Sequence, residues 1–114
     1  MARIDAFLQL AREQGGSDIH LTVGMPPLVR LEGELTALKY RHLDVEETAA
    51  LVQEILPPER NQDLALRGAV DFSYKSPSLG RFRINVYREQ RGLAAACRVI
   101  PARVPRHPAE PEWQ

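Results

Sequence analysis

The segment GRFRINVYREQRGLAAACRVIP, residues 80–101, decides the fold because it predicts a β-hairpin with one apolar face. A turn of even length, over residues 90–91 or 89–92, gives one and the same register. An odd turn would mix apolar and charged side chains on each face, whereas a buried face fixes the register strongly. We therefore expect the even turn, in which Phe82 faces Val99, Ile84 faces Cys97 and Val86 faces Ala95.

The other face of this predicted hairpin carries two arginines side by side. The same register places Arg83 directly opposite Arg98, next to the small side chains of Ala94 and Ala96. Like charges in this position are destabilising, and a guanidinium group matches phosphate and carboxylate groups with two hydrogen bonds. The pattern therefore indicates an anion site on the exposed face. The alternative is that the two side chains extend into water or meet carboxylates elsewhere, where exposed pairs contribute little.

The rest of the chain predicts an α+β domain. Asp44 and Glu47 have the spacing of a capping box at the start of a helix. Apolar periodicity and turn residues predict a helix over residues 3–14, a strand over 17–23, a hairpin of 28–31 and 35–38 around a turn at 32–34, helices over 44–57 and 58–68, and a strand over 69–74. This order predicts an antiparallel sheet of about five to six strands with helices on one face.

Composition excludes several classes of function. Fifteen basic and fifteen acidic residues cancel, which argues against a nucleic-acid partner bound through phosphate neutralisation. The single cysteine, Cys97, excludes an internal disulfide and a zinc framework. Its place on the apolar face predicts an inert core thiol. No metal site is expected. The absence of a long apolar run and of a signal-peptide core predicts a cytosolic protein.

A catalytic set is not evident. The chain contains no GxxxxGK[ST] phosphate loop, no GxSxG and no HExxH. Asp18 and His20 lie on the polar side of the first predicted strand, and they would serve a small enzyme only if a third polar group joined them. A structural role on an alternating strand is the simpler interpretation. Trp113 lies in a proline-rich tail, where it would dock on a partner or have no special role.

Two segments together resemble a known family. GGSDIHLTVGMPPLVRLEGEL (residues 15–35) and VDFSYKSPSLGRFRINVYREQRGLAAACRVIP (residues 70–101) are similar to the N-terminal domain of type IV pilus retraction (twitching motility, PilT-like) and type II secretion ATPases. The resemblance covers roughly residues 4–101. It implies a PAS-like N-terminal domain over residues 1–101, which agrees with the α+β prediction, and leaves 102–114 as a proline-rich linker or disordered tail.

The resemblance also implies residues that contact nucleotide. In that family a RecA-like ATPase domain comes after the N-terminal domain, and arginines on the last strands of the N-terminal domain point to the phosphates of the bound nucleotide. By this resemblance Arg83 and Arg98 are the expected phosphate contacts. Arg81, Arg88 and Arg91 are secondary candidates for phosphate or subunit contacts.

The resemblance has implications for partners and cofactors as well. It implies a RecA-like ATPase domain and the neighbouring subunits of a homohexamer as partners, at the pilus or secretion machinery of the inner membrane. ATP and Mg²⁺ belong to the full-length proteins of the family. Because this chain lacks the phosphate loop, we expect no cofactor in it and no ATP hydrolysis by it. The alternative function is a stand-alone PAS-like interaction or ligand-sensing module, with an interior pocket near Ala95 and Cys97.

Overall fold

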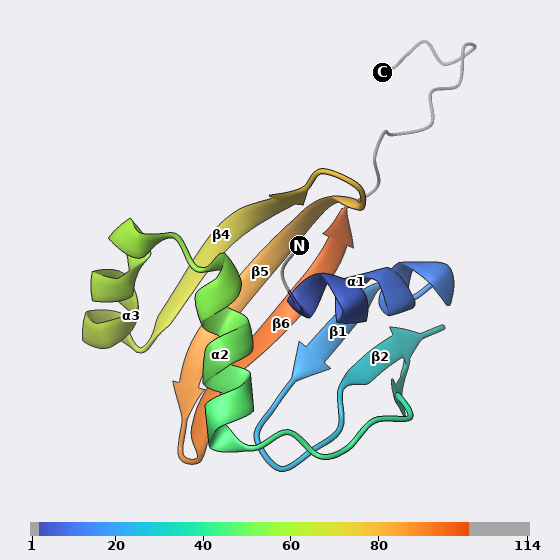
Figure 1. The fold of residues 1–114 in the computed structure, drawn as a ribbon, viewed down its shortest axis with the longest axis horizontal. Coiled ribbons are helices and arrows are strands. Elements are labelled where there is room, and N and C mark those ends of the chain that lie inside the picture. The colour runs from blue at the N-terminus through green and yellow to red at the C-terminus, as the bar shows by residue number, and fades with distance from the viewer. Residues whose placement is uncertain (1–2, 101–114) are drawn as a thin grey trace, which may run out of the picture.

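The computed structural model describes residues 3–100, which form one six-stranded antiparallel sheet and three α-helices (Figure 1). The α+β class and the number of strands are therefore confirmed. The predicted linker or tail over 102–114, including Trp113, lies outside the described residues. The elements are α1 (Ile4–Glu13), β1 (Asp18–Leu21), β2 (Leu28–Leu31), β3 (Glu34–Ala37), α2 (Val45–Ile55), a 3₁₀ turn (Pro58–Arg60), α3 (Asn61–Arg67), β4 (Ala69–Ser76), β5 (Gly80–Glu89) and β6 (Gly92–Ile100).

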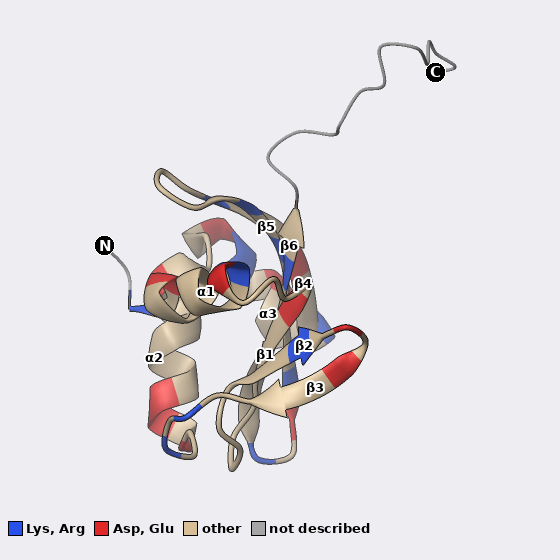
Figure 2. Ribbon diagram, turned by 90° about the vertical axis from the view of Figure 1, so that its right-hand side faces the viewer, with Lys and Arg blue, Asp and Glu red and all other residues tan. Residues whose placement is uncertain are grey.

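The strand order in the sheet is β3-β2-β1-β6-β5-β4. The first strand therefore lies in the middle of the sheet, between β2 and the last strand, β6. Helices α1 and α2 cover one face, and α3 lies beside β4 (Figures 1 and 2). We call the opposite side of the sheet the open face. One apolar cluster, built from α1, α2 and the inward side chains of the strands, fills the space under the helices.

The β5–β6 hairpin has the predicted register. Glu89 pairs with Gly92, so the turn consists of Gln90 and Arg91. The apolar face packs under the helices, where Phe82 and Ile84 are completely buried. Burial of one face fixes the register because a slip of one residue would expose these side chains to water. The three predicted apolar pairs are all present: Phe82 with Val99, Ile84 with Cys97 and Val86 with Ala95.

Helix α2 begins at the predicted cap. The side chain of Asp44 accepts a hydrogen bond of 2.7 Å from the backbone N–H of Glu47. The second half of the capping box does not form. The Glu47 carboxylate instead accepts hydrogen bonds from the hydroxyl of Tyr40 (3.0 Å) and from Nη2 of Arg41 (2.7 Å). This contact secures the segment before α2 against the helix.

The β2–β3 hairpin is tighter than the sequence predicted. Leu31 pairs with Glu34, so the turn holds only Glu32 and Gly33. Both have positive φ angles, 52° and 87°, as a two-residue turn of type I′ requires. The predicted three-residue turn was therefore wrong. The first position of a type I′ turn favours glycine or asparagine, so the glutamate at this position gave no sign of a two-residue turn.

Candidate functional site: an anion pocket on the open face

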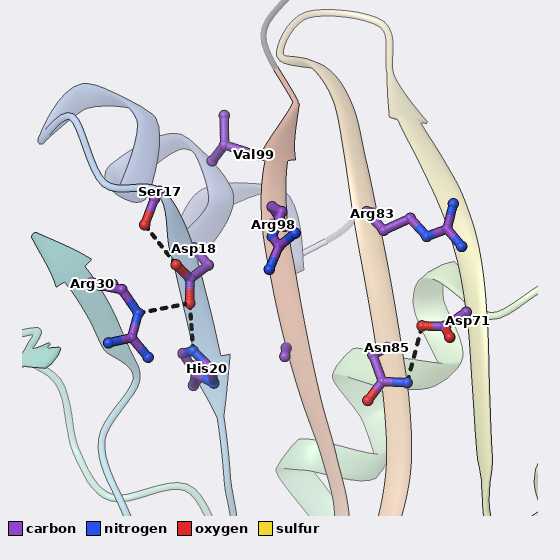
Figure 3. A pocket seen from close by; sticks show the side chains of 10 residues that line it. Ser17, Asp18, His20, Arg30, Asp71, Arg83, Asn85, Arg98 and Val99 are labelled. Atoms are coloured by element: carbon purple, nitrogen blue, oxygen red, sulfur yellow. Dashed lines mark hydrogen bonds and ion pairs between the residues drawn. The ribbon is translucent and has the colours of Figure 1, made fainter. Parts of the chain in front are cut away.

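A row of charged side chains crosses the open face through directly paired strands. Arg30 on β2 pairs with Asp18 on β1, and Asp18 pairs with Arg98 on β6. Arg98 in turn pairs with Arg83 on β5. Because β-strand side chains alternate between faces, and the intervening residues point into the core, all four side chains lie on the open face. Figure 3 shows these side chains on their four neighbouring strands.

A second row lies one step along the strands. His20 on β1 pairs with Ala96 on β6, which pairs with Asn85 on β5, and Asn85 pairs with Asp71 on β4. The small Ala96 side chain separates the polar groups on either side. Together the two rows border an open pocket with a volume of about 730 Å³. The pocket has two basic side chains near its centre and a carboxylate on each flank.

We call Arg83 and Arg98 the arginine pair. The structure places both in the lining of the pocket, on exposed positions of adjacent strands. Within residues 3–100 neither guanidinium forms an ion pair or a side-chain hydrogen bond. The predicted register of the two residues is confirmed. The alternative in which each arginine forms an ion pair with a carboxylate is not found in this part of the chain. Figure 3 shows the Arg83 side chain extending over β4 and the Arg98 side chain over β6, so the two guanidinium groups lie on either side of β5 rather than side by side. Guanidinium groups without a protein anion are suited to an external oxyanion.

The Asp18 carboxylate is held by three neighbours, and we call these four residues the Asp18 cluster (Figure 3). The Ser17 hydroxyl donates to Oδ1 at 2.6 Å. The Nε2 atom of His20 lies 2.5 Å from Oδ2, and Nε of Arg30 donates to Oδ2 at 3.4 Å. Partial burial acts to raise the pKa of Asp18, but the hydrogen bonds from Ser17, His20 and Arg30 and the charge of His20 outweigh it, so the pKa is lowered. Asp18 therefore remains ionised at neutral pH.

The Asp18 cluster does not have the geometry of a catalytic triad. A nucleophilic serine needs an effective base within hydrogen-bond reach. The Ser17 hydroxyl donates to Asp18 and not to His20, and the lowered pKa of Asp18 makes this carboxylate a weak base. The polar groups that join Asp18 and His20 are Ser17 and Arg30, and both donate to the Asp18 carboxylate. Among residues 3–100 there is also no group of three or more His, Cys, Asp or Glu side chains that could hold a metal ion.

The three secondary arginines lie outside the lining of the pocket. Arg81 is exposed and pairs with Lys75 on β4. Arg88 donates to the carbonyl of Ala65 at 2.8 Å and so caps the end of α3. The Arg91 guanidinium lies against Gly24, where a Cβ atom would approach its Nη1 to 2.5 Å. Their role in phosphate or subunit contacts stays a prediction, and Arg88 has a structural role in addition.

The ligand-sensing alternative would need an interior pocket near Ala95 and Cys97. Both residues are fully buried members of the core cluster. Burial raises the pKa of the Cys97 thiol to about 12, so the thiol stays neutral and unreactive, as its place on the apolar face predicted. Separately, no helix within residues 3–100 has the length and apolar character to cross a membrane.

Comparison with known proteins gives matches to type IV pilus and related ATPases. No protein-family model matches the chain. The type IV pilus retraction ATPase PilT of Pseudomonas aeruginosa is 33% identical over 101 residues, covering 89% of this chain and 29% of that protein.

Two solved structures agree with this match. A crystal structure of the pilus retraction motor PilT with bound ADP matches with a TM-score of 0.85 and 40% identity, covering 92% of this chain and 31% of that one. The X-ray structure of the Legionella pneumophila ATPase DotB matches with a TM-score of 0.71 and 25% identity, covering 86% and 28%. The chain thus spans less than a third of the length of these proteins.

Proposed function

Because the chain is homologous, over most of its length, to the N-terminal region of the type IV pilus and secretion ATPases, we propose that its arginine pair contacts the phosphates of a nucleotide held by a RecA-like ATPase domain. The single observation that carries this proposal is the position of Arg83 opposite Arg98 on the open face, with no carboxylate partner within residues 3–100. The ADP named for the PilT crystal structure is consistent with it.

The chemistry of the pocket suits a phosphate group. Two guanidinium forks on adjacent strands present several N–H donors toward one side of the sheet, and a phosphate can accept from both. Arg83 extends over β4 (Figure 3), and its side chain would have to turn toward Arg98 for both guanidinium groups to contact one phosphate. In this role the arginine pair would act as arginine fingers do, by stabilising the charge that develops during phosphoryl transfer. The ATP and Mg²⁺ would be held by the ATPase domain.

The proposed partners are this ATPase domain and the neighbouring subunits of a homohexamer, at the cytoplasmic side of a pilus or secretion machinery in the inner membrane. Residues 1–101 would form the N-terminal domain of such a motor, and 102–114 would connect it to the ATPase domain. The loss or gain of phosphate at the arginine pair would then change how tightly the N-terminal domain packs on the ATPase domain. That coupling would turn hydrolysis into a domain movement.

The test uses a chimera in which residues 1–101 replace the N-terminal region of PilT from P. aeruginosa. Arg83→Gln and Arg98→Gln should each lower the ATPase rate about tenfold or more, since charge stabilisation by an arginine finger is worth at least that much. Lys75→Gln, an exposed cation on β4 outside the pocket, is the matched control and should leave the rate within about twofold of the wild type. Wild-type ATPase rates in both Arg83→Gln and Arg98→Gln would remove the phosphate role.

A further inference from the structure

Asp18 and Arg98 are direct partners across β1 and β6 but form no ion pair, since the ion pairs of Asp18 within residues 3–100 are with His20 and Arg30. Directly opposed side chains in a sheet have Cβ atoms about 5 Å apart, and opposite charges there normally attract. An arginine is long enough to reach across. The separation of these two charges therefore needs a cause.

The cause lies in the other donors around the carboxylate. Oδ1 of Asp18 accepts from the Ser17 hydroxyl, and Oδ2 is engaged by His20 and Arg30. Arg30 is itself secured, because its Nη1 donates to the carbonyl of Gly33 at 3.1 Å. Both oxygens of the carboxylate are thus directed along β1 and toward β2, on the side away from β6.

The carboxylate on the opposite flank is engaged in a similar way. Asp71 on β4 is two residues from Ser73, the direct partner of Arg83, so Asp71 and Arg83 are diagonal neighbours on the open face. Diagonal neighbours lie within reach of long side chains. Yet Oδ1 of Asp71 accepts a 3.0 Å hydrogen bond from Nδ2 of Asn85 (Figure 3), and no ion pair with Arg83 forms.

We propose that Asp18 and Asp71 are positioning residues of the anion pocket. Their carboxylates are restrained by Ser17, His20, Arg30 and Asn85, and this restraint keeps the arginine pair open to an external oxyanion. An unrestrained carboxylate would fold over the adjacent arginine, and a phosphate would have to displace it before binding. The inference rests on the proposed function, because it assumes that the arginine pair is a phosphate site.

Restraint of the two carboxylates predicts an effect on anion affinity that the net charge of the pocket alone does not predict. Ser17 and Asn85 are neutral, so replacing either by alanine leaves the net charge of the pocket unchanged. If only the sum of charges determined affinity, Ser17→Ala would have no effect. If the restraint matters, Ser17→Ala frees Asp18 to pair with Arg98 and lowers the affinity of the pocket for an anion.

The experiment uses the full chain and inorganic pyrophosphate, monitored by NMR shifts of the arginine Nε–Hε groups. Ser17→Ala should weaken binding about tenfold, as expected for one hydrogen bond to a charged group. In an Asp18→Asn background the same substitution should have no effect, because no carboxylate remains to be released. Asn85→Ala with and without Asp71→Asn forms the matching second cycle. Thermal melting checks that each variant is folded.

A readout without ligand completes the test. Asp18→Asn made in the wild-type background should leave the Arg98 Nε–Hε resonance nearly unshifted. The same substitution made in the Ser17→Ala background should shift that resonance strongly, because it removes a carboxylate that pairs with Arg98 there. If Arg98→Gln weakens pyrophosphate binding but Ser17→Ala changes neither affinity nor resonance, the positioning role is overturned and the phosphate role stands. If Arg83→Gln and Arg98→Gln leave binding unchanged, or if the wild type shows no pyrophosphate shift, the phosphate site and the positioning role both fail.

Discussion

The hydroxyl group of Tyr74 donates a 2.7 Å hydrogen bond to Oδ1 of Asp5, which joins the edge strand β4 to helix α1. Asp5 is only 4% exposed. A buried carboxylate that loses its donor has a desolvation cost with nothing to offset it. This one contact therefore ties the N-terminal helix to the edge of the sheet.

We expect Tyr74→Phe to lower the free energy of unfolding by about 1–3 kcal/mol, because it leaves Asp5 buried without its donor. Urea denaturation monitored by circular dichroism measures the change. Tyr87→Phe is the control, since no hydrogen bond of the Tyr87 hydroxyl is present within residues 3–100. Equal stability of the two variants would show that the contact with Asp5 contributes nothing.

The same contact predicts a loss of stability at high pH. Burial, and then the hydrogen bond to Asp5 and the charges of Asp5 and Glu54, raise the pKa of Tyr74 from 10.0 to about 12. The folded state therefore holds the proton more tightly than the unfolded state. The contribution is complete below pH 10 and is lost as the pH rises to about 12. The difference in stability between wild type and Tyr74→Phe should shrink over this window, and a constant difference would contradict the raised pKa.

The cap of α2 should be measurable by a single substitution. Asp44→Ala removes the side-chain acceptor for the N–H of Glu47, and we expect a loss of about 1 kcal/mol in the free energy of unfolding. Glu46→Ala, in the same first turn but without a capping bond, should cost less than half as much. Chemical denaturation of both variants decides the matter, and a larger loss for Glu46→Ala would assign the effect to charge near the helix end.

The β2–β3 turn offers a stabilising change. Glu32 has a φ of 52°, a left-handed conformation that costs most residues about 1 kcal/mol. Asparagine is favoured at this position of a type I′ turn, so Glu32→Asn should raise the melting temperature. Glu34→Asn, on the strand next to the turn, removes the same charge and should give no gain. A similar gain from both variants would point to charge removal as the cause.

The thiol of Cys97 should react only when the protein unfolds. Its pKa is raised to about 12 by burial, and thiolate is the reactive form. In native buffer we expect a thiol-specific chromogenic disulfide to label the chain extremely slowly, with full labelling in denaturant. Rapid labelling under native conditions would show that the β5–β6 hairpin opens far more often than its buried face suggests.

The sequence was sufficient for the parts of the fold that depend on neighbouring residues. The alternation of Phe82, Ile84 and Val86 against charged residues determined the hairpin register, and that register put Arg83 opposite Arg98. Asp44 marked the start of α2 in the same local way. The turn at Glu32 was placed one residue too long because a glutamate at positive φ carries no sequence signal.

The long-range part of the site could not be obtained in this way. Asp18 and Arg98 meet only because β1 pairs with β6, and local patterns do not specify which distant strands pair. Arg30 joins Asp18 for the same reason, through the pairing of β1 with β2. The polar alternation around Asp18 and His20 did indicate which of their faces is open. The structural role of Arg88 at the end of α3 also depends on a contact between distant segments.

The position of β1 between β2 and β6 has a consequence for synthesis of the chain on the ribosome. Ile19 finds its partner, Cys97, only after the last strand has emerged from the exit tunnel. Until then the nascent N-terminal segment keeps one hydrogen-bonding edge unpaired, in the way that makes early intermediates prone to aggregate. The row from Arg30 to Arg83 therefore cannot form before β6 is available to pair with β1 and β5.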